Sequence, residues 1–167
     1  MPAIPTEIIE EKLKARFPES ILQSVMHDIH TLVVDKNKIL EIIKYLYEEE
    51  TLGFRFLTTL CGLHFPKQTG AEIGAMYQLH NLETNTRIRL KAFMPVEKPE
   101  IDSVTPVFSS ANWQERETYD FFGIIFKGHP NLKRILNLDT MEVFPLRKEY
   151  PLQENTRKDK DDKWFGR

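Results

Sequence analysis

The chain has 167 residues, a mass of 19.7 kDa and a formal net charge of −2, with 41% hydrophobic and 29% charged residues. These values are typical of one soluble globular domain, or of a domain followed by a tail, and they exclude a multidomain protein. A chain of this size buries roughly 70% of the surface that its unfolded form exposes, so a core can form without metal or disulfide staples.

Cys61 is the only cysteine, which limits the redox chemistry that the chain can hold. One thiol forms no internal disulfide, and it supplies neither the four ligands of an iron–sulfur cluster nor most of a zinc site. Any redox centres near this protein are therefore expected on other chains, and a reducing cytoplasmic setting fits. Cys61 lies in the most apolar predicted strand without a basic neighbour in sequence, so we expect a buried, unreactive thiol.

Charge and hydropathy favour neither a membrane span nor nucleic-acid binding. The longest apolar runs, around residues 57–63 and 121–126, are far shorter than the roughly 20 residues that cross a bilayer. The acidic N-terminal residues do not resemble an export signal. There is no dense basic stripe to neutralise a phosphate backbone. A mild charge asymmetry along the chain fits a solvated mixed surface, with protein docking as the second interpretation.

The first fifty residues predict two helices that flank two strands. Thr6 is expected to cap a helix that ends before Pro18. Short strands are predicted at residues 20–26 and 31–35. Residues 37–50 carry the strongest helical periodicity in the sequence, with Gly53 as the stop.

The next forty residues change to the two-residue period of strands. Residues 54–65 are apolar at most positions on both faces, which predicts a strand central in a covered sheet. Residues 71–80 and 87–92 alternate, which predicts an antiparallel hairpin with one wet face. The predicted fold class is α+β, a two-layer sandwich with helices packed on one face of a mixed, mostly antiparallel sheet.

The last third is expected to leave this domain. Three prolines punctuate a connector, a short helix is predicted at residues 109–122 with Asn112 as a possible cap, and Gly123 ends it. Residues 137–167 have the pattern of an extended tail, because prolines and seven consecutive charges at 157–163 leave little to bury. We therefore divide the chain into an α+β domain (1–104), a signature helix and turn segment (105–136) and a docking tail (137–167).

Other candidate sites fail on their chemistry. Residues 123–130 have the glycine spacing of a phosphate loop, but His129 stands where the lysine is needed and Pro130 removes a hydroxyl and an N–H. The histidines lack cysteine or carboxylate partners at metal spacing, so hydrogen-bonded or surface histidines are the default.

The densest polar constellation covers residues 113–120. A helix places Trp113, Arg116, Glu117 and Asp120 on one face, which suits neither a plain core face nor a plain solvent face. One interpretation makes Glu117 and Asp120 an acid/base pair of a hydrolase. The favoured interpretation is structural, with Arg116 tying carboxylates to the tail that follows.

The same region carries a longer motif. It runs as Glu-Arg-Glu-x-x-Asp-Phe-Phe-Gly-Ile over 115–124, continues as Phe-x-Gly-His-Pro-Asn-Leu-Lys-Arg-Ile-Leu over 126–136, and ends in Pro-Leu-Arg-Lys-Glu-Tyr-Pro-Leu over 145–152. This pattern resembles the 30-kilodalton subunit family, also called the C subunit, of respiratory complex I, the proton-translocating NADH:quinone oxidoreductase. The chain departs from the family pattern at residues 141–144, Glu149 and Lys133, which affects local tail contacts.

The resemblance implies a hydrophilic peripheral-arm subunit with no cofactor of its own; iron–sulfur clusters, flavin and quinone are expected on other subunits. It implies the D, B and I subunits of complex I as partners, and membrane association only through the complex, on the cytoplasmic side of the inner membrane. No catalytic, cofactor or metal residues are assigned. The structural and interface residues are expected to be Glu115, Arg116, Glu117, Asp120, Gly123, His129, Pro130, Arg134, Pro145, Arg147, Lys148 and Tyr150.

Within this set the carboxylates and Arg116 are expected to fix the exit direction of the tail. Arg147, Lys148 and Tyr150 are expected to dock on a partner. The alternatives are the equivalent subunit of a related membrane-bound hydrogenase or F420-type dehydrogenase, and a stand-alone hydrolase that uses Glu117 and Asp120.

Overall fold

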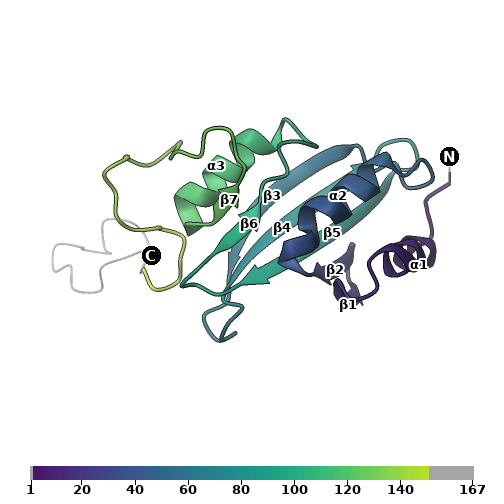
Figure 1. Cartoon of the computed structure of the whole chain (residues 1–167), viewed down its shortest axis with the longest axis horizontal. Helices are drawn as coiled ribbons and strands as arrows, with labels where there is room; N and C mark the ends of the chain where they lie inside the picture. The colour runs from purple at the N-terminus through teal and green to yellow at the C-terminus, as the bar shows by residue number, and fades with distance from the viewer. Residues whose placement is uncertain (1, 151–167) are drawn as a thin grey trace, which may run out of the picture.

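The structure is a computed structural model that describes residues 2–150. Helix α1 (Thr6–Arg16) is followed by strands β1 (Ile21–Met26) and β2 (His30–Val34), then by helix α2 (Ile39–Glu48). A meander of β3 (Phe56–His64), β4 (Ile73–Asn81) and β5 (Thr86–Met94) comes next. The short strand β6 (Glu100–Asp102), helix α3 (Ala111–Phe122) and the short strand β7 (Ile125–Lys127) follow, and a short 3-10 helix η1 (Lys36–Lys38) leads into α2 (Figure 1).

Within residues 2–150 the large sheet has the strand order β1-β2-β5-β4-β3, and there β2 and β5 are the only parallel neighbours in it. Strands β6 and β7 form a separate parallel pair. The predicted α+β class, the mixed sheet and the β4–β5 hairpin are confirmed.

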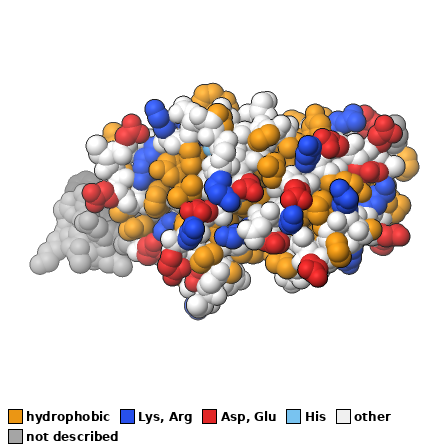
Figure 2. All heavy atoms as spheres, in the orientation of Figure 1, with side chains coloured by type: hydrophobic (Ala, Val, Ile, Leu, Met, Phe, Trp, Pro, Cys, Tyr) orange, Lys and Arg blue, Asp and Glu red, His pale blue; other side chains and the backbone are white. Residues whose placement is uncertain are grey.

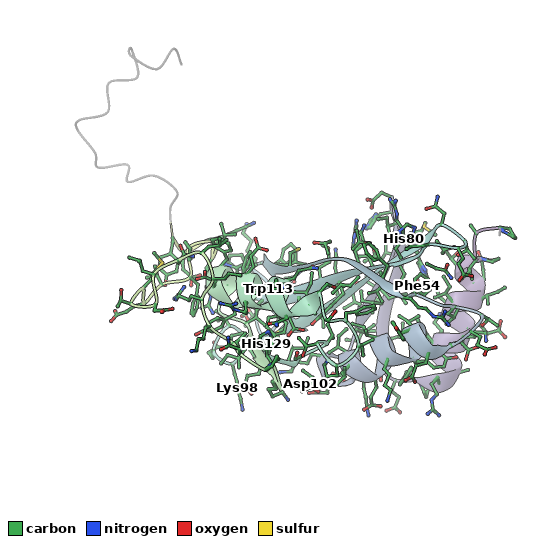
Figure 3. All side chains as sticks on the ribbon, turned by 90° about the horizontal axis from the view of Figure 1, so that it is seen from above. Phe54, His80, Lys98, Asp102, Trp113 and His129 are labelled. Atoms are coloured by element: carbon green, nitrogen blue, oxygen red, sulfur yellow. The ribbon has the colours of Figure 1, made fainter. Side chains whose placement is uncertain are left out.

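All three helices lie on one face of the large sheet. Gly62 is opposite Ala75, which is opposite Ala92, so these three residues point to the same side. Phe122 of α3 occupies the space above Gly62, where an added Cβ would collide with its ring. This side of β5 is buried at every second residue, and α2 contributes four buried side chains to the same core. Figure 3 shows His80 of β4 on the opposite side of the sheet from α2.

Strand β3 is at the edge of the sheet, and its predicted central position is wrong. Its apolar character on both sides has a different cause. Helix α3 packs along β3, and the Gln114 side-chain oxygen accepts a hydrogen bond from the Leu60 N–H on the outer edge. An edge strand that is covered by a helix needs apolar residues where an open edge would carry charges.

Two predicted helix caps are also wrong. Pro5 precedes α1, so Thr6 is its first residue, and no side chain caps it. Asn112 lies inside α3, which follows Ser110 without a side-chain cap. The fixed backbone angle of Pro5 suits the entry to a helix without a capping hydroxyl. The boundary expected at residue 104 is not a gap in packing, because Ala111, Ile124 and Phe126 belong to the same buried core as the sheet.

Residues 128–150 contain no helix or strand and wrap past α3 (Figure 1); residues 137–150 of the predicted tail belong to this segment. The rest of that predicted tail, residues 151–167, lies outside the described residues.

Candidate interface around helix α3

Asp120, near the end of α3, is the anchor of the segment that follows the helix. It is fully buried, and its Oδ2 accepts hydrogen bonds from the backbone N–H groups of Ile135 (3.1 Å), Leu136 (2.8 Å) and Asn137 (2.9 Å). Its Oδ1 accepts from Arg134 (2.8 Å) and from the Asn137 side chain (3.1 Å). Burial alone would raise the pKa of Asp120, but these donors outweigh it and hold the pKa well below its usual range.

Arg134 joins three parts of the chain through one buried guanidinium. Besides Asp120 Oδ1, it donates to the backbone oxygens of Asp120 (2.9 Å), Met141 (2.6 Å) and Val143 (3.0 Å). The planar fork of arginine can serve several acceptors at fixed angles, which a lysine ammonium does not reproduce. Residues 134–143 are therefore closed into a loop whose base is the Asp120–Arg134 pair.

Phe144 lies between two arginines. The guanidinium carbons of Arg134 and Arg147 are 5.0 and 4.8 Å from its ring centre, and Tyr119 of α3 meets it edge-on. Cation–π contacts of this kind are favourable where the cation is partly removed from water. Phe144 thus links α3 to both arginines of the segment that follows it.

Arg147 is directed into its own chain rather than outward. Its Nε donates to the Phe122 backbone oxygen at 2.8 Å, and its side chain is only 12% exposed. This position differs from the docking role expected for it. Lys148 and Tyr150 are exposed, while the Lys148 backbone N–H donates to His64 Nδ1 of β3 at 2.9 Å. The described end of the chain is thereby tied to the sheet edge.

Gly123 is required where α3 ends. Its φ of +74° lies in the left-handed region, and a Cβ added there would be 2.6 Å from the Phe144 ring and 2.7 Å from an Arg147 nitrogen. Both the backbone turn and the approach of these two side chains therefore depend on a residue without a side chain.

Arg116 and His129 hold the first part of the same segment. Arg116 donates to the backbone oxygens of Lys133 and Arg134, both at 3.1 Å, and stacks on Trp113 with 5.4 Å to the ring centre. His129 Nδ1 accepts from the Asn131 N–H, so the proton sits on Nε2, which donates to the backbone oxygen of Asn112 at 3.0 Å. Arg116 and Asp120 both contact the segment that follows α3, and their role in fixing the direction of the tail stays a prediction.

The burial and the hydrogen-bond partners of Glu115 were not predicted from the sequence. It is fully buried, and it accepts hydrogen bonds from the Ser103 hydroxyl (2.6 Å) and the Val104 N–H (2.7 Å), which precede α3 rather than follow it. Burial raises the pKa of Glu115 to about 7, against the lowering effect of both hydrogen bonds. The nearby hydroxyl of Tyr77 is also buried and has no hydrogen-bond partner among the described residues.

The structure does not bring Glu117 and Asp120 together as an acid/base pair. Glu117 is exposed, whereas Asp120 is buried with its oxygens occupied by donors. Glu117 borders a hollow of about 240 Å³ between β3 and α3, which also exposes part of Cys61. Cys61 is half-buried rather than fully buried, and burial raises the pKa of its thiol even though Arg89 and Lys91 lie near enough to lower it. In residues 2–150 no group of three or more metal-binding side chains occurs.

Around α3 the charged side chains of Asp120 and Arg134 are buried, whereas several large apolar side chains are exposed. Trp113 is 60% exposed, Leu136 is 66% exposed and Leu138 is 73% exposed. The further exposed apolar residues of this region are Ile125, Val143, Leu146 and Tyr150. We call these seven residues the α3 apolar patch; Figure 2 shows hydrophobic side chains gathered over α3 and the segment after it. Pro130 is exposed and Pro145 half-buried beside this patch.

The fold and this anchored segment define an α+β protein in which a two-layer domain carries a long irregular segment held by a buried ion pair. The family model for the respiratory-chain NADH dehydrogenase 30 Kd subunit matches residues 32–156. The chain belongs to this family, and the resemblance inferred from residues 115–152 is confirmed.

The chain is also similar to curated proteins named as C subunits of NADH-quinone oxidoreductases. The chain is 43% identical to the C subunit of the NADH-quinone oxidoreductase of Mycolicibacterium gilvum, over 81% of this chain and 61% of that protein. It is also 43% identical to the protein of the same name from a Nocardioides strain, over 73% of this chain and 49% of that one. The chain thus spans about half to three fifths of the length of these relatives.

Two solved structures share the fold. The trypsin-resistant fragment (1-134) of Nqo5 matches with a TM-score of 0.63 and 28% identity, over 75% of this chain and 98% of that fragment. A chain of the membrane-bound sulfane sulfur reductase, an archaeal respiratory membrane complex, matches with a TM-score of 0.72, over 87% of this chain and 85% of that one. At 24% identity, this second likeness concerns the fold alone.

No helix among residues 2–150 is both long enough and apolar enough to cross a membrane.

Proposed function

We propose that this chain is a hydrophilic subunit of the peripheral arm of respiratory complex I, and that it acts by assembly. It binds no cofactor itself and packs beside the D subunit, near the B and I subunits. Iron–sulfur clusters, flavin and quinone belong to other subunits, through which electrons pass from NADH or another donor to quinone while protons are translocated. The chain is attached to the cytoplasmic side of the inner membrane only through the complex, and alone it has no activity.

The observation that carries this proposal is that charged side chains are buried and apolar side chains are exposed around α3. Asp120 and Arg134 are buried there, whereas Leu136 and Leu138 between their anchoring contacts are exposed. A loop that folded for its own stability would bury its leucines and leave its charges in water. Contiguous exposed apolar side chains mark protein contacts, so the buried ion pair holds an apolar surface ready for a partner.

The two leucines are large enough to matter for affinity. Complete burial of one leucine side chain is worth about 1.5–3 kcal/mol, so two leucines contribute several kcal/mol to an assembled interface. Because tenfold in affinity corresponds to about 1.4 kcal/mol, the loss of both leucines should weaken assembly by at least tenfold.

The test uses a double variant with Leu136→Asp and Leu138→Asp. It is expressed in the native host, where it can assemble into the membrane complex. The complex is solubilised in detergent and recovered through the D subunit. Leu82→Asp is the matched control, because Leu82 is 65% exposed but lies in the turn between β4 and β5, away from the α3 apolar patch. We expect recovery with the D subunit to fall at least about tenfold for the double variant and to stay unchanged for Leu82→Asp.

Thermal unfolding of the purified variants shows whether a loss of recovery is caused by misfolding of the chain. Leu136 and Leu138 are exposed, so their replacement should leave the melting temperature nearly unchanged. Undiminished recovery of a normally folded double variant with the D subunit would contradict the proposal. The identity of the recovered partner also separates the alternative, since a D-type partner with nickel-binding cysteines would indicate a related membrane-bound hydrogenase.

Lys148 provides a second, electrostatic test of the docking role expected for residues 147–150. Its side chain is exposed, so Lys148→Glu probes the interface without breaking a contact inside the chain. Arg147 is unsuitable for this purpose, because its guanidinium supports Phe122 and Phe144.

A further inference from the structure

The face of the large sheet that the helices leave uncovered carries cationic side chains from its strands, and the carboxylates of Asp28 and Glu72 near it come from outside the strands. None of the five strands contains an aspartate or a glutamate. On β5 the residues Arg87, Arg89 and Lys91 point away from the helices, because Ile88, Leu90 and Ala92 between them are buried in the core. In Figure 3 His80, which is opposite Arg87, lies on this side. We call this side the open sheet face.

One of the three cations is already neutralised. Arg89 forms a two-pronged pair with Asp28 from the β1–β2 turn, with both nitrogen–oxygen distances at 3.2 Å, and also reaches Gln78. Arg87 and Lys91 form no ion pair within residues 2–150. The carboxylate at the rim is engaged elsewhere: Glu72 accepts from the N–H groups of Gly70 and Val96.

Lys91 has the most informative position. It is half-buried in the middle of the sheet, level with Val33 on β2 and Met76 on β4, and Met76 is level with Cys61 on β3. Two apolar neighbours, Val33 and Met76, thus flank a cation that has no counter-ion among the described residues, and Cys61 lies one strand further on. A solvated face would leave such a lysine extended in water, whereas an interface would supply it with a carboxylate and cover the apolar residues.

The open sheet face continues into an apolar hollow. Phe65 meets Phe93 of β5 edge-on with 5.9 Å between ring centres, and Phe65 also lines a cavity of about 410 Å³. Its other walls are Pro66, Gln68 and two lysines, Lys67 and Lys148. Lys148 belongs to the segment beside the α3 apolar patch, so the two surfaces adjoin at this corner.

We propose that the open sheet face is a second docking surface, and that its occupant is an acidic, partly apolar protein surface of another subunit. A carboxylate of that subunit pairs with Lys91, a second acidic group faces Arg87, and an apolar side chain enters the hollow beside Phe65. This inference rests on the proposed function, because it requires a partner complex. It adds the chemistry of the partner, which must carry carboxylates where this face carries cations.

Two lysines of one chain allow an internal comparison in the experiment. The intact detergent-solubilised complex and the isolated chain are treated with acetic anhydride, and acetylation is followed by mass spectrometry. Lys91 should be protected at least about tenfold on assembly. Lys44 is the control, since it is 62% exposed on α2, on the other side of the sheet, and should be labelled equally in both samples. Equal labelling of Lys91 in both samples would overturn the proposal.

A zero-length carbodiimide cross-link then identifies the occupant. We expect Lys91 to be joined to an aspartate or glutamate of another subunit, and this link to be lost in Lys91→Gln. Cross-links from Lys91 only to a second copy of this chain, or protection of Lys91 by anionic lipid vesicles alone, would each contradict the proposal. The outcome is independent of the Leu136 and Leu138 test: loss of assembly there with an unprotected Lys91 here would refute the second surface and leave the proposed function standing.

Discussion

Asp120 and Arg134 form a buried ion pair, with 2.8 Å between Oδ1 and Nη1, that closes the loop after α3. Fourteen residues separate the partners, and neither side chain is more than 7% exposed. The remaining oxygen of Asp120 is satisfied by three backbone N–H groups, so removal of one partner strands several polar groups at once.

Asp120→Asn should therefore destabilise the chain by about 3–5 kcal/mol, because Arg134 would keep a buried charge without a counter-ion. The free energy of unfolding from urea titration measures this. Glu41→Gln is the matched control: it removes the exposed pair with Lys38 and should cost less than about 1 kcal/mol. A similar loss in both variants would show that the Asp120–Arg134 pair does not hold the loop.

Gly123→Ala should be more costly than Gly128→Ala. Both glycines have positive φ, +74° and +81°, so both substitutions carry about 1 kcal/mol of backbone strain. Only at Gly123 would the new Cβ also meet Phe144 and Arg147; at Gly128 no atom lies within 4 Å. We expect an additional 1–3 kcal/mol, roughly, for Gly123→Ala in the same unfolding assay. Equal costs would mean that the two side chains move away freely.

Glu115 should make stability depend on pH between about 4.5 and 7. Its pKa rises from 4.5 to about 7 on folding, so the folded state favours the protonated acid. The stabilisation is fully present below pH 4.5 and is lost as pH rises through 7, with a total of about 3 kcal/mol. Glu115→Gln keeps a neutral oxygen acceptor, and the Ser103 hydroxyl can turn to suit it.

The difference in unfolding free energy between wild type and Glu115→Gln, measured across pH 4–8, should therefore show this slope. Asp120 gives the opposite trend at lower pH in each protein, because its pKa is depressed and its contribution is lost as pH falls; it cancels in the difference. A difference curve that stays flat between pH 4.5 and 7 would contradict the assignment for Glu115.

Cys61 should react slowly. Burial raises the pKa of its thiol, so little thiolate exists at neutral pH. Iodoacetamide should alkylate the native chain more slowly than glutathione at pH 7.5, and unfolding in urea should remove the difference. Alkylation of the native chain as fast as that of glutathione would indicate an activated thiol.

Several elements were predictable because their signal is local. The apolar spacing of α2 and the alternation in β4 and β5 come from neighbouring residues, and the structure has these elements within one or two residues of their predicted bounds. The edge position of β3 was not predictable in this way. A strand between two sheet neighbours and an edge strand covered by α3 have the same apolar pattern, and only the pairing of distant residues distinguishes them.

In the candidate interface, too, the sequence gives the residue types but does not predict which of them are buried. Glu115 and Glu117 have equal side-chain chemistry and belong to one motif, but they are roughly 200° apart around the helix. One is buried against Ser103 and Val104, and the other is exposed. The motif does not indicate which of the two glutamates is buried, because the residues that cover Glu115 precede the motif in the chain.

The amino-acid sequence alone determined the family, the α+β class and the expectation that a chain with one cysteine leaves redox centres to others. These follow from composition, local periodicity and a motif of adjacent residues. Only the tertiary structure decided that Arg147 supports its own chain, that Asp120 and Arg134 face inward while Leu136 and Leu138 face outward, and that Lys91 is left without a counter-ion among the residues described. The physical reason is that burial and charge pairing are set by contacts between segments distant in the chain, and no local pattern records which segments meet.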